Sequence, residues 1–315
     1  MKPFLLKLFF FLLPLGLLAF AVDYYMTDTL EKSDFTRFRR WAELTRQINA
    51  DILITGSSRA SFHVDPYILD SILQKETFNI GLSGGPYEIS EVALRIYKKH
   101  NKKKIKLILC NVDFLWFGNY AFPGSRVDYA PFYHDPSFEA IVEAMNLSPT
   151  EKYIPAVRYG GQTDLFKKAF GIGPKWEDDL IERKAIWRKG AFLVDKVFQP
   201  LDLLASSKLF QRGEKRIKRF THFLDECKED SIQVVLLKSP IHPSAYKELT
   251  NIEDSFLLID SIAEAYRLNV LDYTDYLIED TTCFLDPVHL NYKGAELFST
   301  CLAHDVDSLL LKIKL

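Results

Sequence analysis

Short apolar runs alternate with longer amphipathic stretches along most of this chain. The runs are rich in branched residues, as in Asp51-Ile52-Leu53-Ile54-Thr55, and such runs are typical of strands buried on both faces. We expect strands at 51–55, 77–80, 105–110, 233–237 and 269–271, and helices at 65–72, from Pro86 onward, and at 216–229, 255–266 and 294–311. This succession predicts an α/β fold with a mainly parallel sheet, whose ligands bind at the carboxyl ends of the strands.

The N-terminus differs from the rest because Lys2 and Lys7 precede an uncharged, mostly apolar run over residues 8–22. A positive end before a membrane-seeking segment predicts that the remaining chain lies on the extracytoplasmic side of a membrane, in the cell envelope or periplasm. We interpret residues 1–23 as an uncleaved signal-anchor, a transmembrane helix. A small-x-small triplet at the end of the run leaves open that residues 1–21 are cleaved and the protein is secreted.

Two further segments accompany the expected strands. Residues 24–50 carry large apolar residues at helical spacing, which predicts a linker helix that packs against the core. Residues 51–315 are expected to form the main α/β domain, interrupted at about 115–217 by a stretch rich in aromatic residues and prolines. We expect a mostly helical insertion there, carried above the sheet. It serves either as a lid or substrate platform, or its aromatic residues form only its own small core.

Composition narrows the function further. The chain has 315 residues, 48% of them hydrophobic and 26% charged, which is enough to bury one large core. Lys and Arg total 40 against 42 Asp and Glu, so no nucleic-acid partner is expected. The four cysteines and seven histidines show no metal-binding spacing, and we expect no metal and no cofactor. Whether two cysteines form a disulfide stays open.

The candidate chemistry lies in Asp286-Pro287-Val288-His289, close to the C-terminus. An Asp three residues before a His, with Pro in the turn between them, can place its carboxylate on one imidazole nitrogen and leave the other free as a base. Such a base needs a nucleophile, and Ser58 lies on the turn after the first strand, at the carboxyl edge of the sheet. The backbone N–H groups of Ser58 and Gly84, on neighbouring turns, can together hold an oxyanion.

The order of these segments resembles the SGNH (GDSL-like) hydrolase superfamily. Ile54-Thr55-Gly56-Ser57-Ser58 is similar to its first block, with Ser58 at the nucleophile, and Asn79-Ile80-Gly81-Leu82-Ser83-Gly84 is similar to its second, with Gly84 as the oxyanion glycine. Asp286-Pro287-Val288-His289 matches the last block. The resemblance implies a three-layer α/β/α sandwich and a triad of Ser58, His289 and Asp286.

The third block departs from this pattern. Where the family usually carries Gly-x-Asn-Asp, this chain has Cys110-Asn111-Val112-Asp113, so that Val112 stands at the position of the oxyanion asparagine. Either Asn111 reaches the site through a shifted loop, or the oxyanion hole has only two backbone donors.

The anchor, the Gly-Ser-Ser turn and the altered third block together resemble the membrane-anchored members that transfer acyl groups to envelope polymers, such as the teichoic-acid D-alanylation protein and the alginate O-acetylation proteins. This resemblance implies an O-acyltransferase or esterase acting on a cell-envelope glycan. Its partners would be an acylated small molecule or envelope polysaccharide, and a membrane-bound O-acyltransferase. A catalytically inactive envelope protein, serving as a glycan-binding or scaffolding module, is the alternative hypothesis.

Three other residues are candidates for substrate binding. Arg59 follows the nucleophile and can hold an anionic group or a neighbouring carboxylate, and Asp113 ends the third block. His242 lies between Ile241 and Pro243 at another strand end, where it contacts substrate or only supports the loop.

Overall fold

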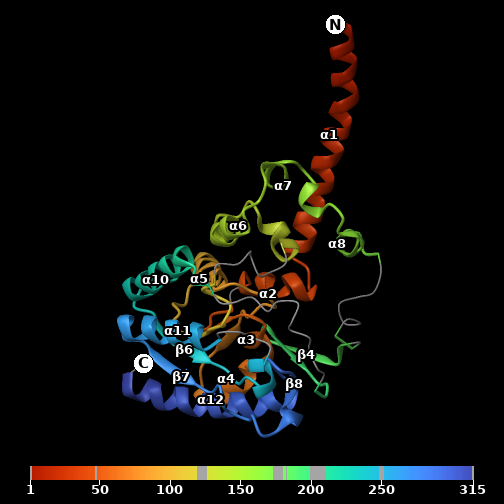
Figure 1. Ribbon diagram of the computed structural model, residues 1–315. Coiled ribbons are helices and arrows are strands. Elements are labelled where there is room, and N and C mark those ends of the chain that lie inside the picture. Colours follow the sequence, from red (N-terminus) through yellow and green to blue (C-terminus); the bar gives the residue numbers. More distant parts are fainter. Residues whose placement is uncertain are drawn as a thin grey trace.

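A five-stranded parallel sheet forms the centre of the molecule (Figure 1). The computed structural model describes residues 2–46, 48–118, 126–172, 180–181, 183–198, 211–247 and 252–313. The strands follow the order β2 (Thr77–Asn79), β1 (Ile52–Gly56), β3 (Leu107–Asn111), β6 (Gln233–Lys238) and β7 (Asn269–Asp272), and every neighbouring pair is parallel. The predicted α/β class with a mainly parallel sheet is confirmed, and each of the five strands lies within two residues of its expected position.

Helices cover both faces of the sheet. Because successive side chains of a strand point to opposite faces, Leu53 packs in one hydrophobic cluster and Ile54 in the other. The first face is covered by α5 (Glu88–His100), α10 (Glu214–Glu229) and α11 (Ile252–Tyr266), and the second by α3 (Ser58–His63), α4 (Pro66–Leu73) and α12 (Tyr292–Ile313). The three-layer α/β/α arrangement follows from this alternation of buried residues on strands that are apolar on both sides.

The predicted start of α4 shows how local sequence fixes these helices. Asp65 is the N-cap of the helix, its carboxylate accepts a hydrogen bond from the N–H of Tyr67 at 3.0 Å, and Pro66 occupies the first position. Asp at the N-cap satisfies an otherwise unpaired helical N–H, and Pro has the required φ angle.

The apolar N-terminal helix projects from the globular part of the molecule (Figure 1). This helix, α1 (Lys2–Glu31), is long and apolar enough to cross a membrane, with a mean hydropathy of 2.4 over its most apolar window. In place of one linker helix over 24–50, the structure continues α1 to Glu31 and starts a second helix, α2 (Thr36–Leu44). Packing explains why α1 continues past its apolar run, because Met26 and Leu30 are buried against the globular part.

The insertion is helical in its first half and ends in a hairpin. Its elements are η1 (Arg126–Phe132), η2 (Pro136–Phe138), α6 (Glu139–Met145), α7 (Pro149–Tyr153), η3 (Val157–Tyr159), α8 (Thr163–Ala169), β4 (Ala185–Arg188) and β5 (Ala191–Val194). The hairpin was not expected, although Lys189 and Gly190 form its two-residue turn with φ angles of +44° and +89°, as this hairpin turn requires. Residues 119–125, 173–179 and 199–210 of the expected insertion lie outside the described residues.

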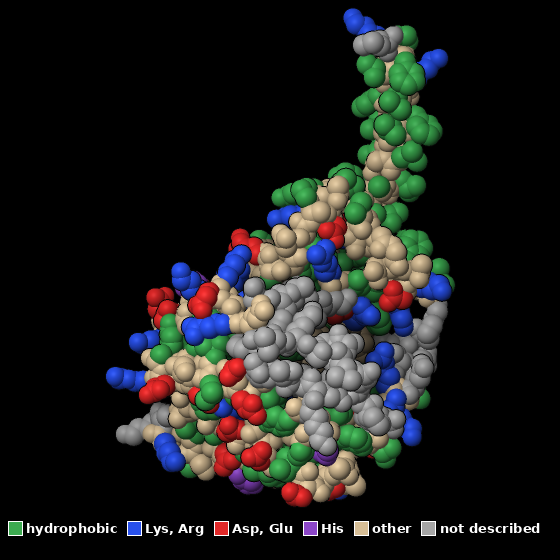
Figure 2. All heavy atoms as spheres, in the orientation of Figure 1, with side chains coloured by type: hydrophobic (Ala, Val, Ile, Leu, Met, Phe, Trp, Pro, Cys, Tyr) green, Lys and Arg blue, Asp and Glu red, His purple; other side chains and the backbone are tan. Residues whose placement is uncertain are grey.

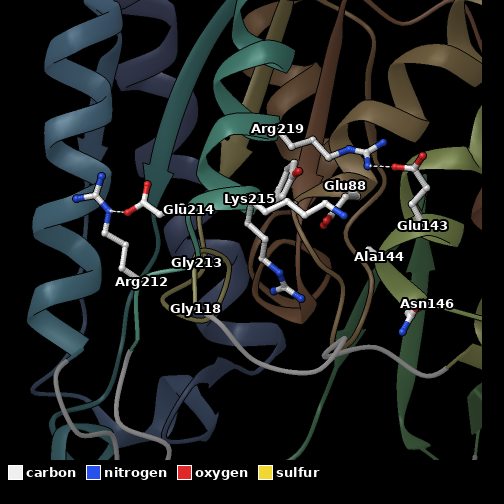
Figure 3. A pocket seen from close by; sticks show the side chains of 12 residues that line it. Glu88, Gly118, Glu143, Ala144, Asn146, Arg212, Gly213, Glu214, Lys215 and Arg219 are labelled. Carbon is white, nitrogen blue, oxygen red and sulfur yellow. Dashed lines mark hydrogen bonds and ion pairs between the residues drawn. The ribbon is translucent and has the colours of Figure 1, made fainter.

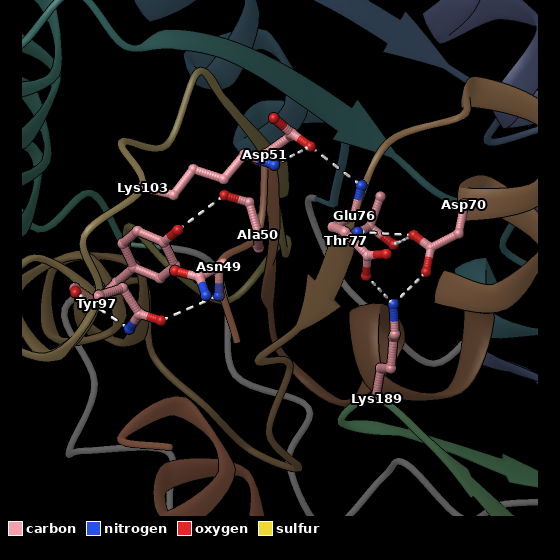
Figure 4. A network of polar contacts seen from close by, with 10 residues as sticks. Asn49, Ala50, Asp51, Asp70, Glu76, Thr77, Tyr97, Lys103 and Lys189 are labelled. Carbon is pink, nitrogen blue, oxygen red and sulfur yellow. Dashed lines mark hydrogen bonds and ion pairs between the residues drawn. The ribbon is translucent and has the colours of Figure 1, made fainter. Parts of the chain in front are cut away.

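A polar network joins the hairpin to the edge of the sheet (Figure 4). The ammonium group of Lys189 makes ion pairs with Asp70 on α4 and with Glu76, which precedes β2. Asp70 also accepts hydrogen bonds from the N–H and hydroxyl of Thr77, at 2.7 and 2.6 Å. The turn of the hairpin is therefore held beside β2.

Close packing fixes the loop after β2 against α3. A Cβ atom at Gly81 would lie 2.5 Å from the backbone nitrogen of Ser61 and 2.7 Å from the Cβ of Ala60. The side-chain amide of Asn79 reinforces this contact by donating to the carbonyl oxygens of Ala60 and Val64 at 2.8 and 2.9 Å. The loop and the helix therefore touch backbone to backbone, and only glycine fits where they cross.

We expect Gly81→Ala to lower the free energy of unfolding by about 1–3 kcal/mol, because an added methyl group must push backbone apart. Urea unfolding of the full chain in detergent, followed by circular dichroism, measures this change. Gly16→Ala is the matched control, since a Cβ at Gly16 meets nothing within 4 Å. Equal unfolding midpoints for Gly81→Ala and Gly16→Ala would contradict the packing described above.

Candidate functional site

A chain of two hydrogen bonds joins three predicted residues from opposite ends of the sequence. The Oγ of Ser58 lies 2.7 Å from Nε2 of His289, and Nδ1 of the same ring lies 2.8 Å from Oδ2 of Asp286. A carboxylate accepts only, so Nδ1 carries the proton that it donates to Asp286, and Nε2 is left to accept the proton of Ser58. The imidazole is thus held in the tautomer that a general base requires.

The local fold explains how Asp286 and His289 are held. Strands β8 (Phe284–Asp286) and β9 (His289–Leu290) form a small antiparallel hairpin in which Asp286 pairs with His289. Oδ1 of Asp286 accepts the N–H groups of Val288 and His289 at 2.9 and 3.0 Å. One carboxylate oxygen therefore fixes the turn while the other orients the ring, and both side chains remain partly accessible, at 13% and 17% exposure.

Ser58 owes its position to the helix that starts directly after β1. Ser57 is the N-cap of α3, and its Oγ accepts the N–H of Arg59 at 3.3 Å while donating to Oδ2 of Asp113 at 2.6 Å. Ser58 follows as the first helical residue and is partly exposed. Among the described residues its backbone N–H has no acceptor, so that group is free to bind an oxygen atom.

Gly84 lies in the turn after β2, at the same edge of the sheet. Its φ angle of +65° favours glycine, and the turn is closed by a hydrogen bond from the N–H of Gly85 to the carbonyl of Leu82 at 2.7 Å. The N–H of Leu82 donates to the carbonyl of Gly56 at 3.2 Å, which ties this turn to the end of β1. Gly84 itself is exposed.

Asn111 lies beneath the site. It ends β3, is 0% exposed, and is flanked by Gly56 on β1 and Leu237 on β6. With its amide oriented so that both atoms find partners, the nitrogen donates to the carbonyl of Leu237 at 3.2 Å and the oxygen accepts the N–H of Ala60 at 3.3 Å. The structure therefore gives Asn111 a role in joining three segments and does not aim it at the open side of Ser58.

The three predicted substrate-binding residues all make contacts within the protein. Arg59 is 1% exposed and donates from Nη2 to the carbonyl of Ser239, and burial lowers the pKa of its guanidinium. Asp113 holds Ser57, as described above, and accepts the N–H of Leu115 at 3.0 Å. His242 donates its backbone N–H to the carbonyl of Pro287 at 3.0 Å, so it supports the loop between Asp286 and His289.

Two residues that the sequence did not single out surround His289. The ring of Phe62 lies 4.9 Å from the His289 ring, and the ring of His63 meets it edge to face at 6.3 Å. Nε2 of His63 accepts the N–H of Leu290 at 3.0 Å, directly after His289. The spacing of four residues from Ser58 to Phe62 was a usable signal, because a helix that starts at Ser58 places both on one side.

A cavity of about 490 Å³ is lined in part by Phe62, whose ring packs against the ring of His289; Ser58 and His289 themselves do not line it. Leu82 and Ser83, from the turn that carries Gly84, form part of its wall. Arg40 also lines it, although this guanidinium is 4% exposed and has a buried Nε without a hydrogen-bond partner among the described residues. Burial lowers the pKa of Arg40 to about 10. The cavity thus offers a polar compartment in which Phe62 is the residue shared with the surroundings of His289.

A second cavity, of about 500 Å³, lies between α5, α6 and α10 (Figure 3). Its lining includes Arg219, which pairs with Glu143 at 2.6 Å, and Arg212, which pairs with Glu214 at 2.7 Å. Burial raises the pKa of Glu88, in the same wall, to about 7. This cavity is a weaker candidate than the one lined by Phe62, because the ring of Phe62 packs against His289.

Two solved structures resemble the chain. A protein provisionally classified as an acylhydrolase, from Bacteroides fragilis, has a TM-score of 0.42 and 10% identity, with 88% of this chain aligned to 99% of that one. A GDSL-like lipase from Bacteroides thetaiotaomicron has a TM-score of 0.41 and 10% identity, with 88% of this chain aligned to all 100% of that one. At these TM-scores the likeness carries no functional argument.

Comparisons of sequence add little to these structural similarities. One protein-family model matches residues 203–311, which is less than half of the chain. No curated protein matches this chain. The class is therefore defined by fold and geometry: an α/β protein with a Ser-His-Asp hydrogen-bonded chain at the carboxyl ends of its parallel strands.

The burial of His63 predicts acid-sensitive folding. Burial, and then the charges of Arg59 and His289, hold the pKa of His63 well below its usual 6.5. Below pH 6.5 the His63 ring binds a proton in the unfolded chain but not in the folded chain. The free energy of unfolding therefore falls as the pH falls, by about 1.4 kcal/mol per pH unit.

We expect His63→Gln to flatten this dependence, because glutamine keeps an acceptor for the Leu290 N–H and does not titrate. Urea unfolding of both proteins at pH 7.5 and pH 5.5 gives the comparison. An identical loss of stability in the two proteins would show that His63 is not the titrating group.

Proposed function

We propose that the protein is a membrane-anchored, extracytoplasmic serine acyl-transfer enzyme of the SGNH (GDSL-like) type. The observation that carries this proposal is the hydrogen-bonded chain of Ser58, His289 and Asp286. Its support is chemical, because a serine hydroxyl becomes a useful nucleophile when a correctly oriented base takes its proton.

The reaction would proceed through an acyl-enzyme. Oγ of Ser58 attacks the carbonyl carbon of an ester while its proton passes to Nε2 of His289, and the imidazolium is stabilised by Asp286 at 2.8 Å. His289 then returns the proton to the departing alkoxide as the carbon–oxygen bond breaks. In the second half, His289 deprotonates the acceptor, which attacks the acyl group and releases Ser58. The acceptor is a hydroxyl of an envelope glycan in a transferase, and water in an esterase.

The oxyanion would be held by two backbone donors, the N–H groups of Ser58 and Gly84. Asn111 is left out of this proposal, because it is fully buried and its amide is occupied by Leu237 and Ala60. One missing donor costs about 3 kcal/mol of transition-state stabilisation, so we expect slow turnover with unactivated esters.

The cavity beside Phe62 would receive the substrate. Its polar lining, which includes Arg40, the hydroxyl of Ser83 and Arg37 paired with Asp128 at 3.0 Å, suits a polar ligand such as a sugar more than a long acyl chain. An apolar helix at the N-terminus supports an envelope location, because it is compatible with either a membrane anchor or a signal sequence. A membrane-bound O-acyltransferase is the proposed partner that delivers the acyl group.

A second candidate function is a catalytically inactive glycan-binding or scaffolding module. The observation in its favour is the third block, where Val112 is fully buried and Asn111 points into the protein interior, so that this block aims no asparagine side chain at the oxyanion. The two candidates differ in one measurable property, the ability to break an ester bond.

Hydrolysis of p-nitrophenyl acetate by the full-length protein in detergent tests the proposal. We expect Ser58→Ala and His289→Gln each to lower kcat/KM at least about 1000-fold, because each removes a group that acts only in the transition state. Ser71→Ala, at an exposed serine of α4, is the control and should keep the wild-type rate. Wild-type activity in Ser58→Ala would contradict the proposal, and a well-folded wild type without activity would favour the binding module.

A further inference from the structure

Exposed apolar side chains gather where α1 leaves the globular part of the molecule. Six of them lie on α7, η3 and α8 and in the turns beside these helices, and each exposes 40% or more of its surface. They are Tyr153, Ile154, Val157, Phe166, Phe170 and Ile172. We name this set the α7–α8 apolar surface. Figure 2 shows hydrophobic side chains at the foot of the projecting helix, continuous with those that cover it.

This surface is fixed to α1 by polar contacts at one level of the helix. Asp23 pairs with Arg158 at 2.5 Å, and their side chains are only 16% and 5% exposed. Asp23 also accepts the N–H of Ala156 at 2.8 Å, and the hydroxyl groups of Thr27 and Tyr159 lie 2.7 Å apart. A partly buried ion pair with added hydrogen bonds holds its segments in a defined geometry.

Aromatic packing adds a second attachment from α8. The ring of Phe170 lies 4.9 Å from the ring of Tyr25, and Phe166 in turn lies 4.5 Å from Phe170. The segment 156–159, which includes η3, and the C-terminal end of α8 therefore contact α1 within residues 23–27, immediately after its apolar run.

The length of α1 indicates where the contacts around Asp23 would lie relative to a lipid bilayer. An α-helix rises 1.5 Å per residue, so about 20 residues cross the hydrocarbon core of a bilayer, which is about 30 Å thick. If residues up to Val22 occupy that core, Asp23 lies at the boundary between lipid and water. Ala156 and Arg158 touch Asp23 and must lie at the same boundary, beside the exposed Ile154 and Val157.

We propose that the α7–α8 apolar surface docks onto the lipid surface around α1 and inserts its side chains among the headgroups and upper acyl chains. The inference rests on the membrane anchor of the proposed function. Its chemistry is that of an interfacial element, with apolar and aromatic side chains towards the lipid. The exposed Lys167 on α8 adds attraction to anionic headgroups.

Docking of the α7–α8 apolar surface, in addition to the anchor α1, would fix the orientation of the globular part. A single helix leaves the globular part free to tilt, whereas a helix together with an apolar surface fixes its orientation. The edge of the sheet that carries Ser58 would then be held at one constant angle and height relative to the membrane. Such a constraint suits the capture of an acyl group delivered at the membrane surface.

Fluorescence quenching in liposomes tests the proposal with the full-length chain. Single cysteines replace Phe166, Ile154, Leu17 or Leu257 in a Cys301→Ser background, because the other three native cysteines are buried. Each protein carries a bimane label and is reconstituted into phosphatidylcholine and phosphatidylglycerol, with or without bromine on the acyl chains. We expect brominated lipid to lower emission at least twofold at positions 166, 154 and 17. Position 257, 63% exposed on α11, is the control and should not change.

Each outcome has a separate meaning. Quenching at position 17 without quenching at 166 and 154 overturns the docking, and assigns the apolar surface to a protein partner or a second copy of this chain. No quenching at position 17 removes the anchor and the docking together. Ester hydrolysis is measured on the same proteins, so a failure of docking is distinguishable from a failure of the catalytic proposal.

Discussion

The pair of hydrogen bonds made by the His289 ring is the interaction on which the candidate site depends. Nδ1 is bound to Asp286 and Nε2 to Ser58, at 2.8 and 2.7 Å, so the ring has one orientation and one tautomer. The first bond is local, because a hairpin of seven residues from Phe284 to Leu290 brings the two side chains together. The second joins segments 231 residues apart, so it requires the fold to bring the start of α3 next to the β8–β9 hairpin.

Beneath these groups lies a buried polar layer that joins three strand ends. Asn111 at the end of β3 connects to Ala60 on α3 and to Leu237 on β6, while Arg59 reaches the carbonyl of Ser239. Buried polar atoms are costly unless they are paired, and these pairs can form only in one register of β1, β3 and β6. The layer therefore fixes the turn that carries Ser58. Asn111 does not serve as a third oxyanion donor, but it supports the helix that carries the nucleophile.

Much of the fold could be predicted because its signals are local or periodic. Strands buried on both faces produce continuous apolar runs, and Asp65 followed by Pro66 marks a helix start without tertiary information. The triad candidates were found for the same reason, as Asp286 and His289 are three residues apart. The direction of Asn111 could not be predicted, because neighbouring strands decide which way an amide points at a strand end. The six-residue helix α3 was not predicted, because it is too short to show more than the single spacing of Ser58 and Phe62.

The central proposal is that Ser58, at the carboxyl edge of the sheet, forms a covalent bond with the acyl group. Reaction with a fluorophosphonate, followed by peptide mass spectrometry, tests this most directly because the reagent attaches only to an activated serine. We predict one adduct, on the peptide that contains Ser58, and none in His289→Gln. A folded wild type that stays unlabelled, or an adduct on a different serine, would contradict it.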